Sequence, residues 1–144
     1  MNRQFPLAGL LRLRQMQQDQ AATGLARANS RSQAARDRRA AARTELGNSG
    51  DTAGSSSALL AIAAARASSQ SMLADLEALE AATEAHLAEA RSEYTEARRQ
   101  AVGLEKLEFR HGAELALAEL RTEQGVLDEI ASTSWHRKAG KASS

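Results

Sequence analysis

Apolar residues recur along the chain at intervals of three and four positions, which is the period of an α-helix. The pattern runs from Pro6 to Leu46 and again from Ala58 to about residue 134, and a segment rich in glycine and serine at 47–57 interrupts it. Pro6 suits the first turn of a helix because its missing N–H has no partner inside the helix there. The pattern therefore predicts two long helices joined by a loop.

The loop is expected to extend beyond the glycine-rich segment. Serines cluster between Ser68 and Ser71, where their side chains compete for backbone hydrogen bonds. If the two ends of the chain lie side by side, the midpoint of the hairpin also falls near residue 70. We therefore predict an all-α fold in one domain, a long antiparallel coiled-coil hairpin with a first arm at 6–46, an irregular tip at 47–71 that contains a short helix at about 58–67, a second arm at 72–134 and a flexible basic tail at 135–144.

The apolar seam of the first arm is thin because alanine fills most of its positions, whereas leucine is common in the second arm. The first seam is predicted at Leu7, Leu10 or Leu11, Ala21, Leu25, Ala28, Ala35, Ala42 and Leu46. The second is predicted at Leu73, Leu76, Leu87, Ala90, Tyr94, Ala97, Ala101 and Leu104, with a further stripe at Phe109, Ala113, Leu117, Leu120, Leu127 and Ile130. Opposing residue numbers then sum to about 139, which places Gly24 level with Gly112. A close approach of the helices and neutral drift both remain open as explanations for these glycines.

Composition and charge support the hairpin. Aromatic residues make up 3% of the chain, so a large globular core is not expected. Residues 1–46 hold nine arginines and three acidic residues, a net charge of +6. Residues 58–134 hold seven basic and fourteen acidic residues, a net charge of −7. An antiparallel arrangement sets these opposite charges against each other, which favours this pairing of the arms.

The sequence gives little support for a catalytic site or a metal-binding site. The sequence has no cysteine, which excludes disulfides, thiolate metal sites and thiol nucleophiles. Glu108 and His111 have the Glu-x-x-His spacing of a di-iron ligand pair, but a centre needs a second such pair, and a solvated or seam-edge histidine is the better interpretation. A two-helix hairpin offers no enclosed pocket for a catalytic triad. We expect a protein that is not an enzyme and has no metal, cofactor or small-molecule substrate.

Two further properties bear on partners and location. The apolar run from Phe5 to Leu11 is too short to span a membrane and is followed by arginines rather than a cleavage site, which favours a cytoplasmic protein. A basic stretch could contact nucleic acid, but no aromatic residues interleave for base stacking and the whole chain has a net charge of only +1. This stretch comprises Arg27, Arg31, Arg36, Arg38, Arg39 and Arg43.

The two ends of the chain resemble a known family. The run Phe5-Pro-Leu-x-x-Leu-Leu-x-Leu-Arg14, followed by a glutamine-rich helix, is similar to the opening of the flagellar export protein FliJ. The C-terminal arm resembles the close of that family through Leu104-Glu-Lys-Leu107, Arg110, Glu123 and Leu127-Asp-Glu-Ile-Ala131. The matching stretches cover about a third of the chain. The middle departs from the family, because glycine, serine and alanine replace its aromatic tip.

The resemblance implies a cytoplasmic, non-enzymatic component of the flagellar type III export apparatus, docked at the cytoplasmic face of the membrane. Its implied partners are the hexameric export ATPase, the export gate protein and substrate chaperones. We expect the ATPase to contact the paired ends of the arms, at Leu10, Leu11, Arg12, Leu13 and Arg14 with Asp128, Glu129 and Ile130. We expect the gate to contact Leu46, Leu76 and Leu79.

Two other functions remain open from the residues alone. A generic coiled-coil scaffold could dimerise through the thin seam of the first arm, and a nucleic-acid binder would use the arginine stretch.

Overall fold

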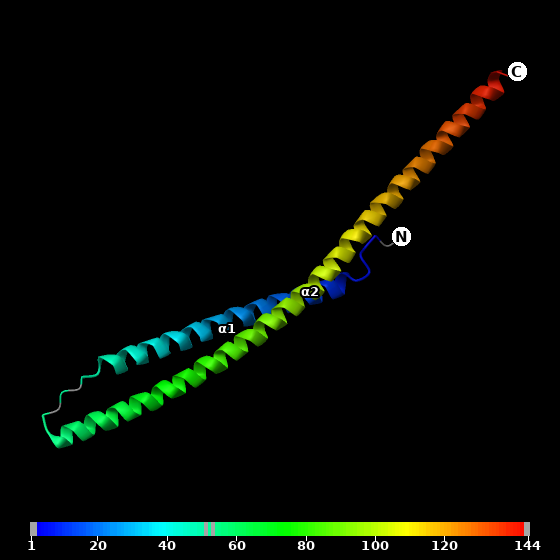
Figure 1. Ribbon diagram of the computed structural model, residues 1–144. Coiled ribbons are helices and arrows are strands. Elements are labelled where there is room, and N and C mark those ends of the chain that lie inside the picture. Colours follow the sequence, from blue (N-terminus) through cyan, green and yellow to red (C-terminus); the bar gives the residue numbers. More distant parts are fainter. Residues whose placement is uncertain (1–2, 51, 53, 143–144) are drawn as a thin grey trace. The chain divides into compact units, whose positions relative to one another are not determined.

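The computed structural model describes residues 3–50, 52 and 54–142 of the chain. These residues form two helices, α1 (Ala8–Asn48) and α2 (Ser56–Ala142), and no strand occurs among them (Figure 1). The helices run antiparallel and contact each other, so the predicted all-α helical hairpin is confirmed.

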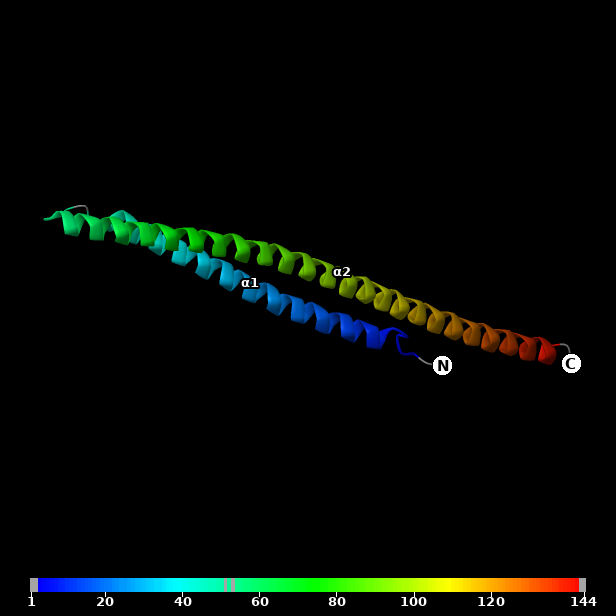
Figure 2. The ribbon, with the colours of Figure 1, turned by 90° about the horizontal axis from the view of Figure 1, so that it is seen from below.

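The chain divides into two compact units, and both helices contribute to each. Unit 1 holds the described residues of Met1–Arg14 and Gln100–Ser144, and unit 2 is Gln15–Arg99. Within unit 2, α1 and α2 lie side by side, as Figures 1 and 2 show. The assignment of the whole chain to one domain stays a prediction.

The predicted tip at 47–71 is too long, because α2 begins at Ser56 and continues without a break. The Oγ atom of Ser55 accepts a hydrogen bond from the backbone N–H of Ala58 at 3.2 Å, and its carbonyl accepts one from Leu59 at 3.0 Å. This cap satisfies N–H groups that a helix start leaves without partners. The predicted short helix at 58–67 is therefore the first part of α2, and the serines that follow remain exposed within it.

The predicted flexible tail at 135–144 is also wrong as far as the described residues extend. Helix α2 continues to Ala142, and the rings of Trp135 and His136 lie 5.4 Å apart in an edge-on arrangement. No proline interrupts this segment, so the helix can continue through it. Residues 143 and 144 lie outside the described residues.

Pairing of the helices differs from the predicted register. In unit 2, ion pairs join Arg36 to Glu84 at 3.2 Å, Arg39 to Glu80 at 2.7 Å and Arg43 to Glu77 at 3.7 Å. The residue numbers of each pair sum to 119 or 120. The predicted sum of 139 is wrong because the early start of α2 shortens the turn between the helices.

The new register separates the two glycines that were expected at one level. Gly24 belongs to unit 2, where it lines a surface groove with Ala90 and Glu93, whereas Gly112 belongs to unit 1. A Cβ atom added at either glycine would meet nothing within 4 Å. A close approach of the helices therefore does not explain these glycines.

The seam of α1 alternates strictly between spacings of three and four residues, as in a coiled coil. The seam positions, all buried or half-buried, are Leu11, Arg14, Gln18, Ala21, Leu25, Ala28, Ser32, Ala35, Arg39, Ala42 and Leu46, and Ala8 and Gln17 are half-buried outside this spacing. The predicted seam residues from Ala21 onward are confirmed, whereas Leu7 and Leu10 are exposed and Leu11 takes the seam position. On α2 the predicted positions from Leu73 to Leu104 are all buried or half-buried.

A charged pair occupies one position of this seam, near the C-terminal end of α1. The guanidinium of Arg39 donates to Glu80, whose side chain is only 13% exposed. This hydrogen bond, together with the negative charge of Glu80, raises the pKa of Arg39 above its usual value. A raised pKa adds stability that is lost only as the pH rises through it, so this arginine gives no pH dependence near neutrality.

Ser32 is another polar residue in the seam, and the burial of its hydroxyl group lowers the stability of the hairpin. Its side chain is 2% exposed and its Oγ atom has no hydrogen-bond partner among the described residues. Ser32→Ala is expected to raise the free energy of unfolding by about 1 to 2 kcal/mol, because it removes an unsatisfied buried hydroxyl and improves helix propensity. Urea unfolding followed by circular dichroism measures this. The exposed Ser30→Ala variant should gain only about 0.5 kcal/mol, and equal gains at both positions would contradict the prediction.

Candidate protein-interaction surfaces

The C-terminal part of α2 extends past the last residue that contacts the N-terminal segment. Arg3 forms an ion pair with Glu119 at 3.2 Å. From Ala116 to Ala142 every residue of α2 is exposed, and beyond Glu119 no other described segment of unit 1 pairs with this helix (Figure 1). We call residues 120–142 the overhang. It is a single helix whose apolar side chains face solvent.

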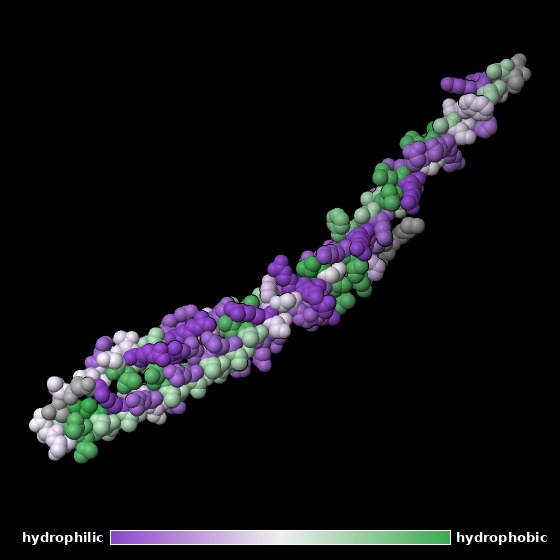
Figure 3. Space-filling view, in the orientation of Figure 1, coloured by the Kyte–Doolittle hydropathy of each residue, from purple (hydrophilic) through white to green (hydrophobic). Residues whose placement is uncertain are grey.

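An apolar stripe on this helix lies opposite the seam. His111 marks the seam side, because its ring lies 5.6 Å from that of Phe5 in the N-terminal segment. Phe109, Leu120 and Leu127 are 2, 9 and 16 positions from His111, and each is therefore about half a turn away from it at about 100° per residue. These side chains are 80%, 61% and 60% exposed, and Figure 3 shows apolar side chains on the visible surface of this segment.

We call Phe109, Ala113, Leu117, Leu120 and Leu127 the outer stripe. The sequence revealed these residues as a second apolar stripe, which the longer register would have placed beside the first arm. Because these side chains face away from the seam, and the N-terminal segment pairs no farther along α2 than Glu119, the outer stripe has no covering segment among the described residues. Exposed apolar stripes of this kind on a helix are typical of sites that bind another protein.

The predicted ATPase-binding residues of the first arm face two directions. Leu10, Arg12 and Leu13 are exposed, and the two leucines are 38% and 47% exposed. Leu11 is only 5% exposed and lies in the seam, and Arg14 donates a hydrogen bond to the side-chain carbonyl of Gln100. Only the first three are therefore accessible to a partner while the hairpin stays closed.

The structure does not bring these residues together with Asp128, Glu129 and Ile130. The contact between Phe5 and His111 places Leu10 near residue 106 of α2. The second group therefore lies about 30 Å farther along the same helix, at about 1.5 Å per residue. Consecutive residues also point about 100° apart, so these three side chains face three directions.

Of the residues predicted to contact the export gate, only one is freely accessible. Leu46 and Leu76 are half-buried at seam positions of unit 2, so contact with a partner would require the helices to separate. Leu79 is 41% exposed and stands outside the seam. These three assignments stay predictions, with Leu79 the most accessible of them.

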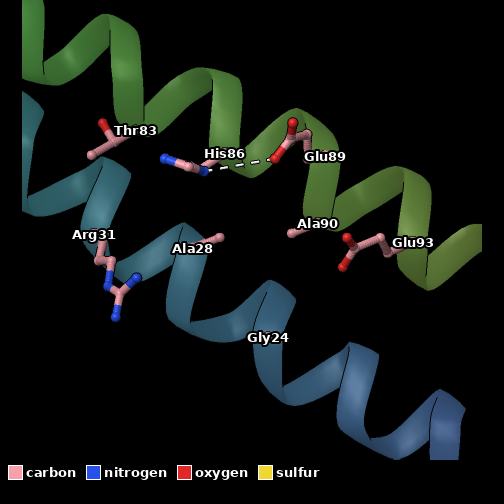
Figure 4. A pocket seen from close by; sticks show the side chains of 8 residues that line it. All are labelled: Gly24, Ala28, Arg31, Thr83, His86, Glu89, Ala90 and Glu93. Carbon is pink, nitrogen blue, oxygen red and sulfur yellow. Dashed lines mark ion pairs between the residues drawn. The ribbon is translucent and has the colours of Figure 1, made fainter.

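A shallow groove of about 290 Å³ lies between the helices of unit 2. Small residues face each other there, with Gly24 and Ala28 on α1 opposite Ala90 on α2 (Figure 4). On its rim His86 lies 3.7 Å from Glu89, and both side chains are more than 70% exposed. The groove follows from small side chains at one level and is open to solvent.

Glu108 and His111 do not form a ligand pair in this structure. Glu108 is exposed, whereas the buried Nε2 atom of His111 has no hydrogen-bond partner among the described residues. Within the part of the chain that the structure describes, no three histidine or acidic side chains are grouped to hold a metal. Neither helix, over its described length, has a segment long and apolar enough to cross a membrane.

Half of the basic stretch is already occupied within the chain. Arg36, Arg39 and Arg43 form the three ion pairs with α2 that are described above. The other three arginines, Arg27, Arg31 and Arg38, are exposed. The seam of the first arm is filled by α2, so a second copy could not use it while the hairpin stays closed.

Comparisons with known proteins give one match. A family model described as the flagellar FliJ protein matches residues 3–140, which is nearly the whole chain. Searches among curated proteins and among solved structures give no significant match.

Proposed function

The chain belongs to the flagellar FliJ family, and from this premise we propose that it is a non-enzymatic stalk of the flagellar type III protein export apparatus. In this role the overhang and the N-terminal part of α1 bind the hexameric export ATPase, and unit 2 contacts the export gate and substrate chaperones. The partner hydrolyses ATP. The protein acts in the cytoplasm, docked at the cytoplasmic face of the membrane.

The overhang is the observation that carries this proposal. A long helix that exposes leucines on one face cannot gain much stability by itself, because isolated helices rely on packing of their apolar face. Leu120 and Leu127 of the outer stripe lie in the overhang and give a partner two exposed apolar anchors. A single helix is also narrow enough to enter the opening of a ring, since its diameter with side chains is about 10 to 12 Å.

Reconstitution with the cognate export ATPase tests the proposal. We expect the full chain to co-elute with the ATPase in size-exclusion chromatography and to increase its assembly or turnover. A chain that ends at Glu119 keeps the residue that pairs with Arg3 but lacks the overhang, and it should lose both effects.

The control for this truncation is its stability. Circular dichroism should show that the shortened chain unfolds at nearly the same urea concentration, because the removed residues are all exposed. If the full chain neither binds the ATPase nor changes its turnover, the stalk role is wrong. Binding that survives removal of the overhang would instead place the ATPase contact elsewhere on the chain.

A further inference from the structure

The end of α2 carries its charges in two blocks on the side of the outer stripe. Leu120 and Leu127 are seven positions apart and therefore point within about 20° of each other, at about 100° per residue. The charged side chains between residues 119 and 142 that point within about 90° of Leu127 are Glu119, Glu123, Arg137, Lys138 and Lys141. The acidic ones precede Leu127 and the basic ones follow it, so one half of this side is negative and the other half is positive. We call this side of residues 119–142 the divided face.

No charge of the opposite sign lies in either half of the divided face. The other charged or titratable side chains of this stretch point about 100° or more away from Leu127, and they are Arg121, Asp128, Glu129 and His136. Every residue from 119 to 142 is exposed, and Leu120, Leu127 and Ile130 are at least 60% exposed. The divided face is therefore accessible to a partner along its whole length.

The divided face has the residue spacing of a coiled coil. Intervals of four and three residues alternate, as they do in the seam of the hairpin, through Leu120, Gln124, Leu127, Ala131, Ser134 and Lys138. Ile130 borders the middle of this row. A second helix can pack along such a row, and beyond Glu119 no described segment of unit 1 pairs with α2.

We propose that a second copy of this chain pairs with the divided face in antiparallel orientation. With a two-fold axis between Ile130 and Ala131, the numbers of opposing residues sum to about 261. Glu123 then lies opposite Arg137 and Lys138 of the second copy. The two-fold symmetry forms the same contact again at the other end of the overlap.

Charge and length both favour a second copy as the partner. Its own divided face carries the complementary charges once it is turned end for end, whereas parallel pairing sets acidic side chains on acidic ones and basic on basic. In the antiparallel arrangement Glu119 lies level with residue 142 of the second copy. The N-terminal segments pair no farther along α2 than Glu119, so they lie outside the overlap and neither hairpin has to open.

Such a dimer is weak, and it excludes the contact proposed for the ATPase. Each copy contributes three large apolar side chains, Leu120, Leu127 and Ile130, so we expect a dissociation constant on the order of 10 to 100 µM. The dimer covers Leu120 and Leu127, which are also the proposed anchors for the ATPase, so a chain cannot make both contacts at once. Only this exclusion rests on the proposed stalk function, and the pairing itself does not.

Charge-swap variants of the full chain test the pairing in the absence of the ATPase. Glu123→Arg places an arginine against the basic half of a second copy, and Arg137→Glu/Lys138→Glu places two glutamates against the acidic half. We expect each variant alone to self-associate about tenfold or more weakly than the natural chain. An equimolar mixture of the two variants should recover the natural affinity to within about threefold, because both contacts of the mixed dimer again join opposite charges. Sedimentation velocity, with one variant fluorescently labelled in the mixture, measures the dissociation constants.

The matched control is Glu129→Arg, which makes the same change of charge as Glu123→Arg on the far side of the helix. It should alter self-association by about twofold or less. A natural chain that stays monomeric at about 1 mM, an equal loss in the control variant, or no recovery in the mixture overturns the proposal. A monomeric chain whose binding to the ATPase is weakened by Glu123→Arg assigns the divided face to the ATPase and overturns it as well.

Discussion

Replacing Leu87 with alanine is expected to lower the free energy of unfolding by about 3 kcal/mol, the largest effect of any single truncation in unit 2. Leu87 is 5% exposed. The register of the neighbouring ion pairs places it opposite Ser32, and Ala28, Ser32 and Ala35 are the most buried side chains of α1 in this unit. Their spacing is that of the hole into which a coiled-coil knob inserts.

The loss arises because small side chains cannot fill the space that the leucine leaves. Alanine and serine have no rotamers that reach into it, so the helices must shift or leave a cavity. Urea unfolding followed by circular dichroism measures the change. The matched control is Leu79→Ala, because that leucine is on the same helix but 41% exposed, and it should cost about 1 kcal/mol or less. Equal costs would show that the packing around Leu87 is loose.

The helices themselves could be predicted from periodicity, and the register could not. The strict spacing of Leu25, Ala28 and Ala35 identified a buried face without any structure. The predicted register rested on the assumption that the two ends of the chain lie side by side and that the serines between Ser68 and Ser71 interrupt the helix. Helix α2 instead continues through these serines to Ala142, far beyond the N-terminal segment, and nothing in the periodicity of either helix shows how far one extends past the other.

Polar seam residues were missed for a different reason. Ser32 and Arg39 occupy positions of the heptad that the three-and-four spacing assigns to the seam, but an analysis that counts only apolar residues omits them. Continuing the spacing through polar residues would have found both. The sequence could not identify Glu80 as the partner of Arg39, because this pairing depends on the observed register of the two helices.

The resemblance to FliJ at the two ends is confirmed over residues 3–140. The expected binding residues at those ends stay predictions, and they were chosen from family-like positions rather than from exposed faces. Leu11 and Arg14 turned out to belong to the seam, whereas Leu120 and Leu127 are exposed on the overhang. A partner protein binds a continuous exposed face of the helix. Such a face can be identified only when the register of the two helices is known.

The outer stripe gives the second large prediction, which rests on the proposed stalk function. Leu120→Asp/Leu127→Asp is expected to weaken binding to the export ATPase by about 100-fold, because two apolar anchors are replaced by charges that the interface must desolvate. Both leucines are about 60% exposed, so the hairpin should unfold at nearly the same urea concentration as the natural chain. Titration of fluorescently labelled protein with the ATPase measures the affinity.

The control for this experiment changes the same kind of residue on another face. Val126 is 51% exposed and directly precedes Leu127, so it points about 100° away from the outer stripe, toward the side that continues the seam. Val126→Asp should change ATPase affinity by about threefold or less. If Val126→Asp weakens binding as much as the double variant does, the ATPase contacts several faces of the helix and not the outer stripe alone. If neither variant weakens binding, the outer stripe is not the contact, even where the full chain still stimulates the enzyme.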